Sequence, residues 1–193
     1  AMRDIKHPNL IAQYGAGITK PHCWVATELV EGASLAELLR TGRQSWRMVA
    51  RMVSEIAQAL VVAADHQVLH RNISPSSIRI RGADGVAKLG DLILAKALEG
   101  TRAERLTKPG ETVGELPFLA PESLFDEPMD IYSLGITAYT ALAGKNPFLG
   151  KNVSETIANV INLKPPTLRS IDSSIPPSIE NLLFRMIASQ PDG

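Results

Sequence analysis

The side chains best suited to chemistry gather in one stretch, HQVLHRNISPSSIRI, which runs from His66 to Ile80. Within residues 70–77 it carries an imidazole, a guanidinium, an amide and three serine hydroxyls, but no carboxylate. An amide cannot take a proton near neutral pH, so Asn72 cannot act as a general base. A carboxylate, Asp91, follows further along the chain. This stretch therefore either takes part in catalysis without a carboxylate of its own or has a purely structural role.

The composition narrows the class of protein. The chain has 193 residues, of which 45% are hydrophobic and 21% charged, as expected for one compact soluble domain. Twenty basic and twenty acidic residues give a net charge of zero, which argues against a general nucleic-acid or membrane-surface binder. No apolar run approaches the roughly 18 residues of a membrane span, and no signal peptide opens the chain.

The number of cysteines indicates the cellular compartment of the chain. Cys23 is the only cysteine, so no disulfide framework is possible within one chain. We therefore expect a reducing, cytoplasmic environment, either for a cytoplasmic protein or for the cytoplasmic part of a larger membrane protein. We expect no membrane contact by this segment.

Two short strand-like segments open the chain, at 9–16 and 23–29. We predict that the glycine-rich run Gly15-Ala16-Gly17 forms a turn between them, rather than a phosphate-binding loop, because no helix follows it.

Two serines predict the starts of helices. Ser34 has Glu37 three residues later, which is the spacing of a capping box, so a short helix is expected there. Ser45 is a suitable N-cap for a long helix, because apolar residues recur at three- and four-residue spacing from Met48 to about Asp65.

The stretch from His66 to Ile80 leads into a predicted β-hairpin. Residues 67–80 are expected to be a loop that ends in a short strand, followed by a turn at 83–85 and a second strand at 86–89. The polar segment 98–116 is expected to be a long loop, a kind of segment that is usually functional or disordered. Further helices are expected at 129–143, 153–161 and 177–189.

Six motifs occur in a fixed order: HPNL at 7–10, TELVEG at 27–32, HRN at 70–72, KLGDLILAK at 88–96, LAPES at 119–123 and DIYSLGITAYTALAGKNPF at 130–148. Together they resemble the protein kinase family, of Ser/Thr type and similar to bacterial receptor-like kinases. The resemblance implies an α+β, mainly α, fold: a large helical lobe, 32–193, preceded by a remnant of the small-lobe sheet, 1–31. The family's glycine-rich loop, strand lysine and helix glutamate have no counterpart in this sequence.

The resemblance assigns the catalytic loop. Asn72 stands where the family has its catalytic Asp, Ser74 where it has a Lys that neutralises the γ-phosphate, and Ser77 where it has a metal-binding Asn. General-base help, worth roughly 10²–10⁴ in rate, is then missing. A hydroxyl is also a poorer fixed ligand for Mg²⁺ than an amide oxygen. None of the three positions is expected to support catalysis.

The metal and nucleotide positions are partly retained. Asp91 matches the metal-binding Asp of the D-F-G motif, and is either a weak Mg²⁺ ligand or a structural carboxylate. Leu92 can pack as the family's Phe does, whereas Ile93 replaces a glycine. Arg79 stands at the position under the adenine ring, so it either fills that pocket or points to solvent.

The hinge resemblance places Thr27 at the gatekeeper position. The backbone groups of Glu28 and Val30 could bind adenine. Asp130, His70 and Glu122 match architectural residues, and Asp130 is expected to anchor the amides of the catalytic loop. Arg71 either binds a phosphate on the following loop, which contains Thr101, Thr107 and Thr112, or faces solvent. Glu115 stands where the family has a threonine that helps to hold the substrate.

These residues predict a kinase-like domain without efficient phosphotransfer, a pseudokinase that acts as a regulatory or protein-binding module in signalling. The alternatives are an atypical Ser/Thr protein kinase and a nucleotide-binding switch. No cofactor is expected, or Mg-ATP if any nucleotide binds. The expected partner is a protein and not a nucleic acid, and the sequence leaves its identity and the oligomeric state open.

Overall fold

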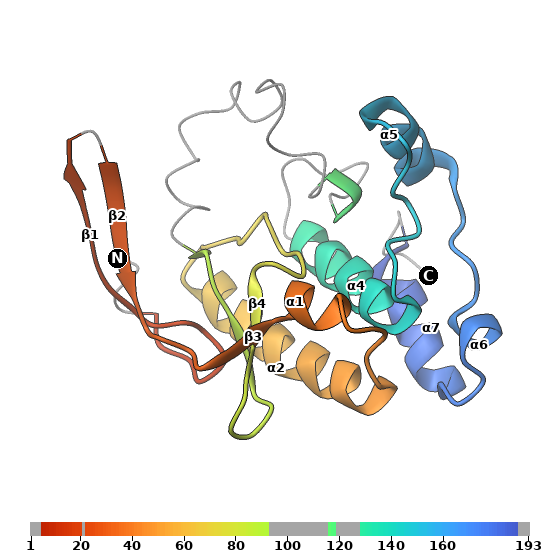
Figure 1. The fold of residues 1–193 in the computed structure, drawn as a ribbon, viewed down its shortest axis with the longest axis horizontal. Coiled ribbons are helices and arrows are strands. Elements are labelled where there is room, and N and C mark those ends of the chain that lie inside the picture. The colour runs from red at the N-terminus through yellow and green to blue at the C-terminus, as the bar shows by residue number, and fades with distance from the viewer. Residues whose placement is uncertain (1–4, 21, 93–115, 119–127, 189–193) are drawn as a thin grey trace.

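The computed structural model describes residues 5–20, 22–92, 116–118 and 128–188. Its fold is α+β and mainly helical, which confirms the predicted class (Figure 1). In chain order the elements are β1 (Gln13–Thr19), β2 (His22–Thr27), β3 (Gly32–Ser34), α1 (Leu35–Leu39), α2 (Trp46–Asp65), β4 (Ile78–Arg81), β5 (Ala87–Leu89), the 3-10 helix η2 (Leu116–Phe118), α4 (Pro128–Ala143), α5 (Val153–Asn162), α6 (Leu168–Ile171) and α7 (Pro177–Met186).

The hairpin of β1 and β2 extends away from the helical body (Figure 1). The predicted turn at Gly15-Ala16-Gly17 is wrong, because these residues lie inside β1 and the strands are joined after Thr19. Gly17 pairs with Trp24, and a Cβ at Gly17 would lie 2.6 Å from the indole Cζ2. The glycine therefore admits the tryptophan ring across the strands instead of reversing the chain.

A second sheet has the order β3-β4-β5 and is antiparallel throughout. The segment before β1 runs beside its β5 edge in the parallel direction. The Leu89 N–H donates to the Asn9 carbonyl at 2.8 Å, and the Ile11 N–H donates to the Leu89 carbonyl at 2.9 Å. The Asn9 side chain adds a bond from its Nδ2 to the Ala87 carbonyl at 2.8 Å. Leu10 is thereby buried in the core of the helical body.

The two predicted helix starts are confirmed. Ser34 and Glu37 form a reciprocal capping box at α1, and the Ser45 hydroxyl accepts the Met48 N–H at the start of α2. One face of α2 is buried and packs against α4. Its buried residues are Val49, Met52, Val53, Ile56, Ala59, Leu60 and Ala63.

Helix α4 lies at the centre of the helical body, in contact with α2, α6 and α7 (Figure 1). Gly135 allows the close approach of α7, because a Cβ there would lie 2.9 Å from the Met186 Cβ. The helices predicted at 129–143, 153–161 and 177–189 correspond to α4, α5 and α7, although α7 ends at Met186. The short elements β3 and α6 were not predicted.

No helix among the described residues has the length and the apolar character needed to cross a bilayer. Of the predicted loop at 98–116, only Leu116 lies within the described residues, and it belongs to η2. The division of the chain at residue 31 into a small-lobe remnant and a large lobe stays a prediction.

Candidate functional site

Asp130, near the start of α4, holds the loop between α2 and β4. Its Oδ2 accepts the His70 N–H and its Oδ1 accepts the Arg71 N–H, both at 2.7 Å. The residue is only 6% exposed. A carboxylate suits this position because it offers acceptors alone to two amides that are screened from water. This is the contact that the kinase resemblance implies for Asp130.

The His70 ring is fully engaged in the interior. It is 1% exposed, and its Nε2 lies 2.6 Å from the Gly90 carbonyl oxygen. Because a carbonyl can only accept, Nε2 carries the proton, which leaves Nδ1 to accept the Asn72 N–H at 3.3 Å. Nε2 therefore ties the loop to Gly90, which follows β5, while Nδ1 braces the loop internally, so both ring nitrogens have structural partners.

Arg71 and Asn72 follow in a strained part of the loop. Arg71 has a φ of +61°, a left-handed conformation that is costly for a residue other than glycine. The Asp130 bond to its N–H helps to hold that conformation. Its Nε is buried and has no hydrogen-bond partner among the described residues. Asn72, which the resemblance matches to the catalytic Asp of the family, is half-buried beside it.

Ser74 and Ser77 are joined across a turn by hydrogen bonds. The Ser77 Oγ accepts the Ser74 N–H at 3.1 Å and donates to the Ser74 carbonyl at 3.0 Å. The Ser74 hydroxyl pairs with that of Ser76 at 2.7 Å. Ser74 is 1% exposed and Ser77 is 3% exposed. Both hydroxyls therefore stabilise the loop from within, and neither supplies the positive charge that a lysine would bring.

Asp91 leaves β5 close to this turn, because the Gly90 N–H donates to the Ser77 carbonyl at 2.8 Å. Asp91 is exposed and has a φ of +58°. The next residue, Leu92, is buried in the main core, as expected from the resemblance. Within the described ranges, no three His, Cys, Asp or Glu side chains are grouped so that they could hold a metal ion. Asp91 is thus a carboxylate outside any such group, and its neighbour Gly90 contacts the backbone of Ser77.

Arg79 lies on the face of the second sheet that is turned away from the core. Ile78 and Ile80 pack toward the core, so Arg79 occupies the other face of β4. It pairs with Lys88 of β5, and its Nη2 donates to the Gly32 carbonyl at 2.8 Å. The side chain is half-buried along β3 instead of extending freely into solvent.

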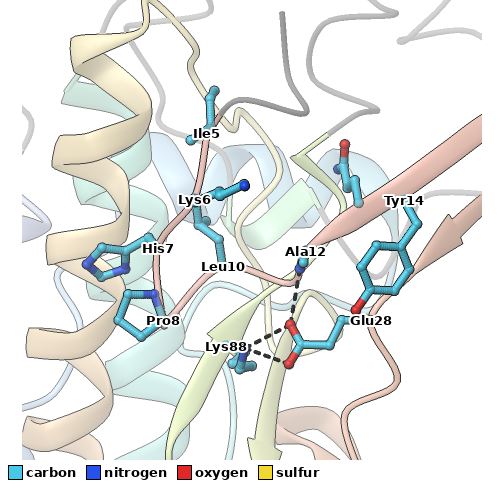
Figure 2. Close-up of a pocket in the computed structure, with 10 residues that line it drawn as sticks. Ile5, Lys6, His7, Pro8, Leu10, Ala12, Tyr14, Glu28 and Lys88 are labelled. Carbon is cyan, nitrogen blue, oxygen red and sulfur yellow. Dashed lines mark hydrogen bonds and ion pairs between the residues drawn. The ribbon is translucent and has the colours of Figure 1, made fainter.

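An ion pair that sequence reasoning missed joins the hinge to β5. Lys88 Nζ lies 2.7 Å and 2.8 Å from the two carboxylate oxygens of Glu28, and Glu28 Oε2 also accepts the Ala12 N–H at 3.1 Å (Figure 2). Burial raises the pKa of Glu28, but the hydrogen bonds from Lys88 and Ala12 outweigh it and hold that pKa below its ordinary value. The signal was the lysine inside the apolar strand AKL, since a buried cation requires an anion.

A pocket of about 520 Å³ opens beside this pair, between the first described residues and the start of β1 (Figure 2). Its lining is Ile5, Lys6, His7, Pro8, Leu10, Ala12, Gln13, Tyr14, Glu28 and Lys88. Of the residues predicted to contact a nucleotide, only Glu28 lines it. Thr27 ends β2 and is exposed, while Val30 is buried.

Several predicted residues lie outside the described ranges: Glu122, Glu115, Ile93, Thr101, Thr107 and Thr112. The structure brings together His70, Arg71, Asn72, Ser74, Ser77, Asp91 and Asp130 around one loop. Thr27 ends β2 in the first sheet, Glu28 and Val30 lie between β2 and β3, and Arg79 lies in β4 of the second sheet.

Comparison with known proteins identifies the family of the chain. The chain is 27% identical over 194 residues to the serine/threonine-protein kinase PAK mbt of Drosophila melanogaster, and 28% identical over 193 residues to PrkC of Bacillus subtilis. It is 29% identical over 197 residues to PknJ of Mycobacterium tuberculosis. These matches cover 97–98% of this chain, but the chain spans only 29–33% of the length of these relatives. The model of the protein kinase domain matches residues 1–193, and the chain therefore belongs to the protein kinase domain family.

Proposed function

We propose that this chain is a pseudokinase: a kinase-fold domain without efficient phosphoryl transfer that acts as a regulatory or protein-binding module. The observation that carries the proposal is the loop at 70–77, where Asn72, Ser74 and Ser77 replace the groups that the reaction needs. The loop is firmly held by Asp130 and His70, so its geometry is kept while its chemistry is missing.

The first missing group is the base. Phosphoryl transfer to a hydroxyl is helped by a carboxylate that orients the hydroxyl and accepts its proton. The Asn72 amide can orient a hydroxyl by a hydrogen bond, but it cannot accept the proton. A loss of roughly 10²–10⁴ in rate is expected from this replacement alone.

The second missing element is positive charge. A lysine at position 74 would neutralise phosphate oxygens, whereas the Ser74 hydroxyl is buried and bonded to Ser76. The Ser77 hydroxyl donates its proton to the Ser74 carbonyl and accepts the Ser74 N–H with one lone pair. It could offer a metal only its second lone pair, so a divalent ion would depend mainly on Asp91.

A second candidate function is that of an atypical Ser/Thr protein kinase or a nucleotide-binding switch. The exposed carboxylate of Asp91 and the intact Asp130 scaffold favour it. Mg-ATP would then be held by Asp91 and by the backbone of Glu28 and Val30, with Arg79 at the base of the site. Placement alone can contribute large rate factors, so slow transfer could persist without a base.

The setting of the function is also a proposal. The absence of any cysteine besides Cys23 favours a cytoplasmic location. A net charge of zero favours a protein partner over a nucleic acid.

Thermal unfolding of this chain with and without Mg-ATP tests the proposal. A ligand at 100 times its dissociation constant adds about 2.7 kcal/mol to the folded state, or about 5–10 °C in midpoint for a chain of this size. The pseudokinase proposal expects no phosphotransfer. A midpoint shift that Asp91→Ala removes, without transfer, would support the nucleotide-binding switch. Transfer that Asp91→Ala removes would support the atypical kinase.

A further inference from the structure

The outward face of the second sheet carries two cations side by side. Arg79 of β4 lies directly opposite Lys88 of β5, and residues paired in this way across antiparallel strands share one face. The neighbouring pair, Ile78 and Leu89, is buried in the core. Because successive side chains of a strand alternate between its two faces, Arg79 and Lys88 both point away from the core.

Both cations contact the segment that joins β2 to β3, residues 28–31, or the residue directly after it. Lys88 pairs with the carboxylate of Glu28, at the start of this segment (Figure 2). The Arg79 Nη2 donates to the carbonyl of Gly32, which follows the segment, at 2.8 Å. The segment is therefore fixed at both of its ends by side chains that come from the outward face of the sheet.

The two cations differ in how their charges are compensated. Lys88 has both carboxylate oxygens of Glu28 within 2.8 Å. Within the described part of the chain, no carboxylate forms a salt bridge with Arg79, and its hydrogen bond goes to a neutral carbonyl. A guanidinium has five N–H donors, so the remaining donors of Arg79 depend on water. A neutral group that covers Arg79 would remove this hydration without supplying an anion.

We propose that Arg79 prevents adenine nucleotides from binding at the backbone of Glu28 and Val30. Because the segment 28–31 is fixed along the outward face, a ring bonded to its backbone meets Arg79 there. The ring must either displace the guanidinium from the Gly32 carbonyl or cover it. A cation–π contact at an exposed site recovers only part of either loss.

This inference rests on the proposed function, because the nucleotide position is the one proposed there. It adds a second and separate reason for the absence of phosphoryl transfer. The replacement of the catalytic acid by Asn72 removes the chemistry, whereas Arg79 prevents the nucleotide from binding at all. Arg79 is thus a specificity-determining residue of the site, and it acts against the nucleotide.

The sign of the charge makes the expected effect of Arg79→Leu specific. ATP is an anion, so the loss of a cation weakens its long-range attraction to the chain. A purely electrostatic role of Arg79 therefore predicts equal or weaker binding of Mg-ATP to the variant. Exclusion by Arg79 predicts the opposite, a gain in affinity, and it predicts the same gain for adenosine, which carries no phosphate.

Isothermal titration calorimetry with Mg-ATP and with adenosine tests the proposal. Arg79→Leu and Arg79→Met both remove the guanidinium, and either serves if its circular dichroism spectrum matches that of the unmodified chain. Arg40→Leu is the control, because Arg40 is an exposed arginine at the end of α1. We expect the unmodified chain and Arg40→Leu to bind both probes with dissociation constants above ~1 mM. Both Arg79 variants should bind them at least tenfold more tightly, below ~0.1 mM.

Hydrogen exchange locates the bound probe. Adenosine should slow the exchange of the Val30 amide in Arg79→Leu and leave it unchanged in Arg40→Leu. A gain of less than tenfold in the Arg79 variants, binding of either probe by the unmodified chain, or protection only outside residues 28–32 would overturn the role of Arg79. None of these results by itself contradicts the pseudokinase proposal. Phosphotransfer by Arg79→Leu would overturn the pseudokinase proposal and support exclusion by Arg79.

Discussion

Replacing Asp130 removes the acceptor for two backbone amides at once, those of His70 and Arg71. Both bonds are 2.7 Å long and the carboxylate is 6% exposed, so water replaces it poorly. A buried N–H left without an acceptor costs about 1–3 kcal/mol. Asp130→Asn keeps one acceptor oxygen and should cost about 2 kcal/mol, whereas Asp130→Ala loses both acceptors and should cost about 4 kcal/mol.

These losses are large against the total stability of a domain, which is about 5–15 kcal/mol. For a chain of this size, 1 kcal/mol shifts the unfolding midpoint by about 2–4 °C. We therefore expect midpoints lower by about 4–8 °C for Asp130→Asn and by about 8–16 °C for Asp130→Ala. Urea unfolding followed by circular dichroism gives the free energies directly. Asp65→Asn is the control, because Asp65 is exposed at the end of α2, and this variant is expected to lie within about 0.5 kcal/mol of the unmodified chain.

Hydrogen exchange separates a local effect from a global one. The amides of His70 and Arg71 should lose protection more than those of α2, because Arg71 is held at a φ of +61° partly by its bond to Asp130. If Asp130→Asn unfolds at the same urea concentration as the unmodified chain and protects both amides equally well, the carboxylate does not hold the loop and the reasoning fails.

Changes at three other residues, Glu28, Gly32 and Tyr139, have defined outcomes. Glu28→Gln leaves the Lys88 ammonium without its counter-charge and should lower the unfolding free energy by about 2 kcal/mol, the cost for a buried pair reduced for partial exposure; a double-mutant cycle with Lys88→Met should show that the two losses are not additive. Because the pKa of Glu28 is lowered in the folded state, its contribution is present above its ordinary pKa and is lost as the pH falls through the folded pKa, so acid titration of the stability should show this loss only when Glu28 is intact. Gly32→Ala should prevent stable folding or cost more than about 3 kcal/mol, because its Cβ would lie 2.1 Å from the Ile80 carbonyl oxygen at a φ of +153°; normal thermal unfolding of this variant would contradict the β3 geometry. Burial raises the pKa of Tyr139 to about 12, so stability should fall between about pH 10 and pH 12, where the unfolded chain ionises first, and Tyr139→Phe should lack this alkaline component.

Features set by neighbouring residues could be predicted from the sequence. The capping box of Ser34 and Glu37 and the N-cap Ser45 were found because a cap depends on residues three positions apart. The fold class followed from the order of the kinase motifs. The packing of Leu92 in the core also followed from its motif position.

Features set by distant residues could not be predicted in this way. A glycine can indicate either a turn or a place where another group packs closely against the backbone. Gly17 is of the second kind, because the Trp24 ring from the neighbouring strand packs against it, and the sequence alone does not show this contact. The Lys88–Glu28 pair joins residues far apart in the chain.

The central claim is that the loop around Asn72 keeps its geometry without its chemistry. The measurement that tests it most directly is transfer of the labelled γ-phosphate of ATP, with Mg²⁺, to the chain itself and to Ser/Thr protein substrates, with Asp91→Ala as the control. The account predicts that the unmodified chain incorporates no more label than Asp91→Ala. Incorporation by the unmodified chain that Asp91→Ala abolishes would contradict it.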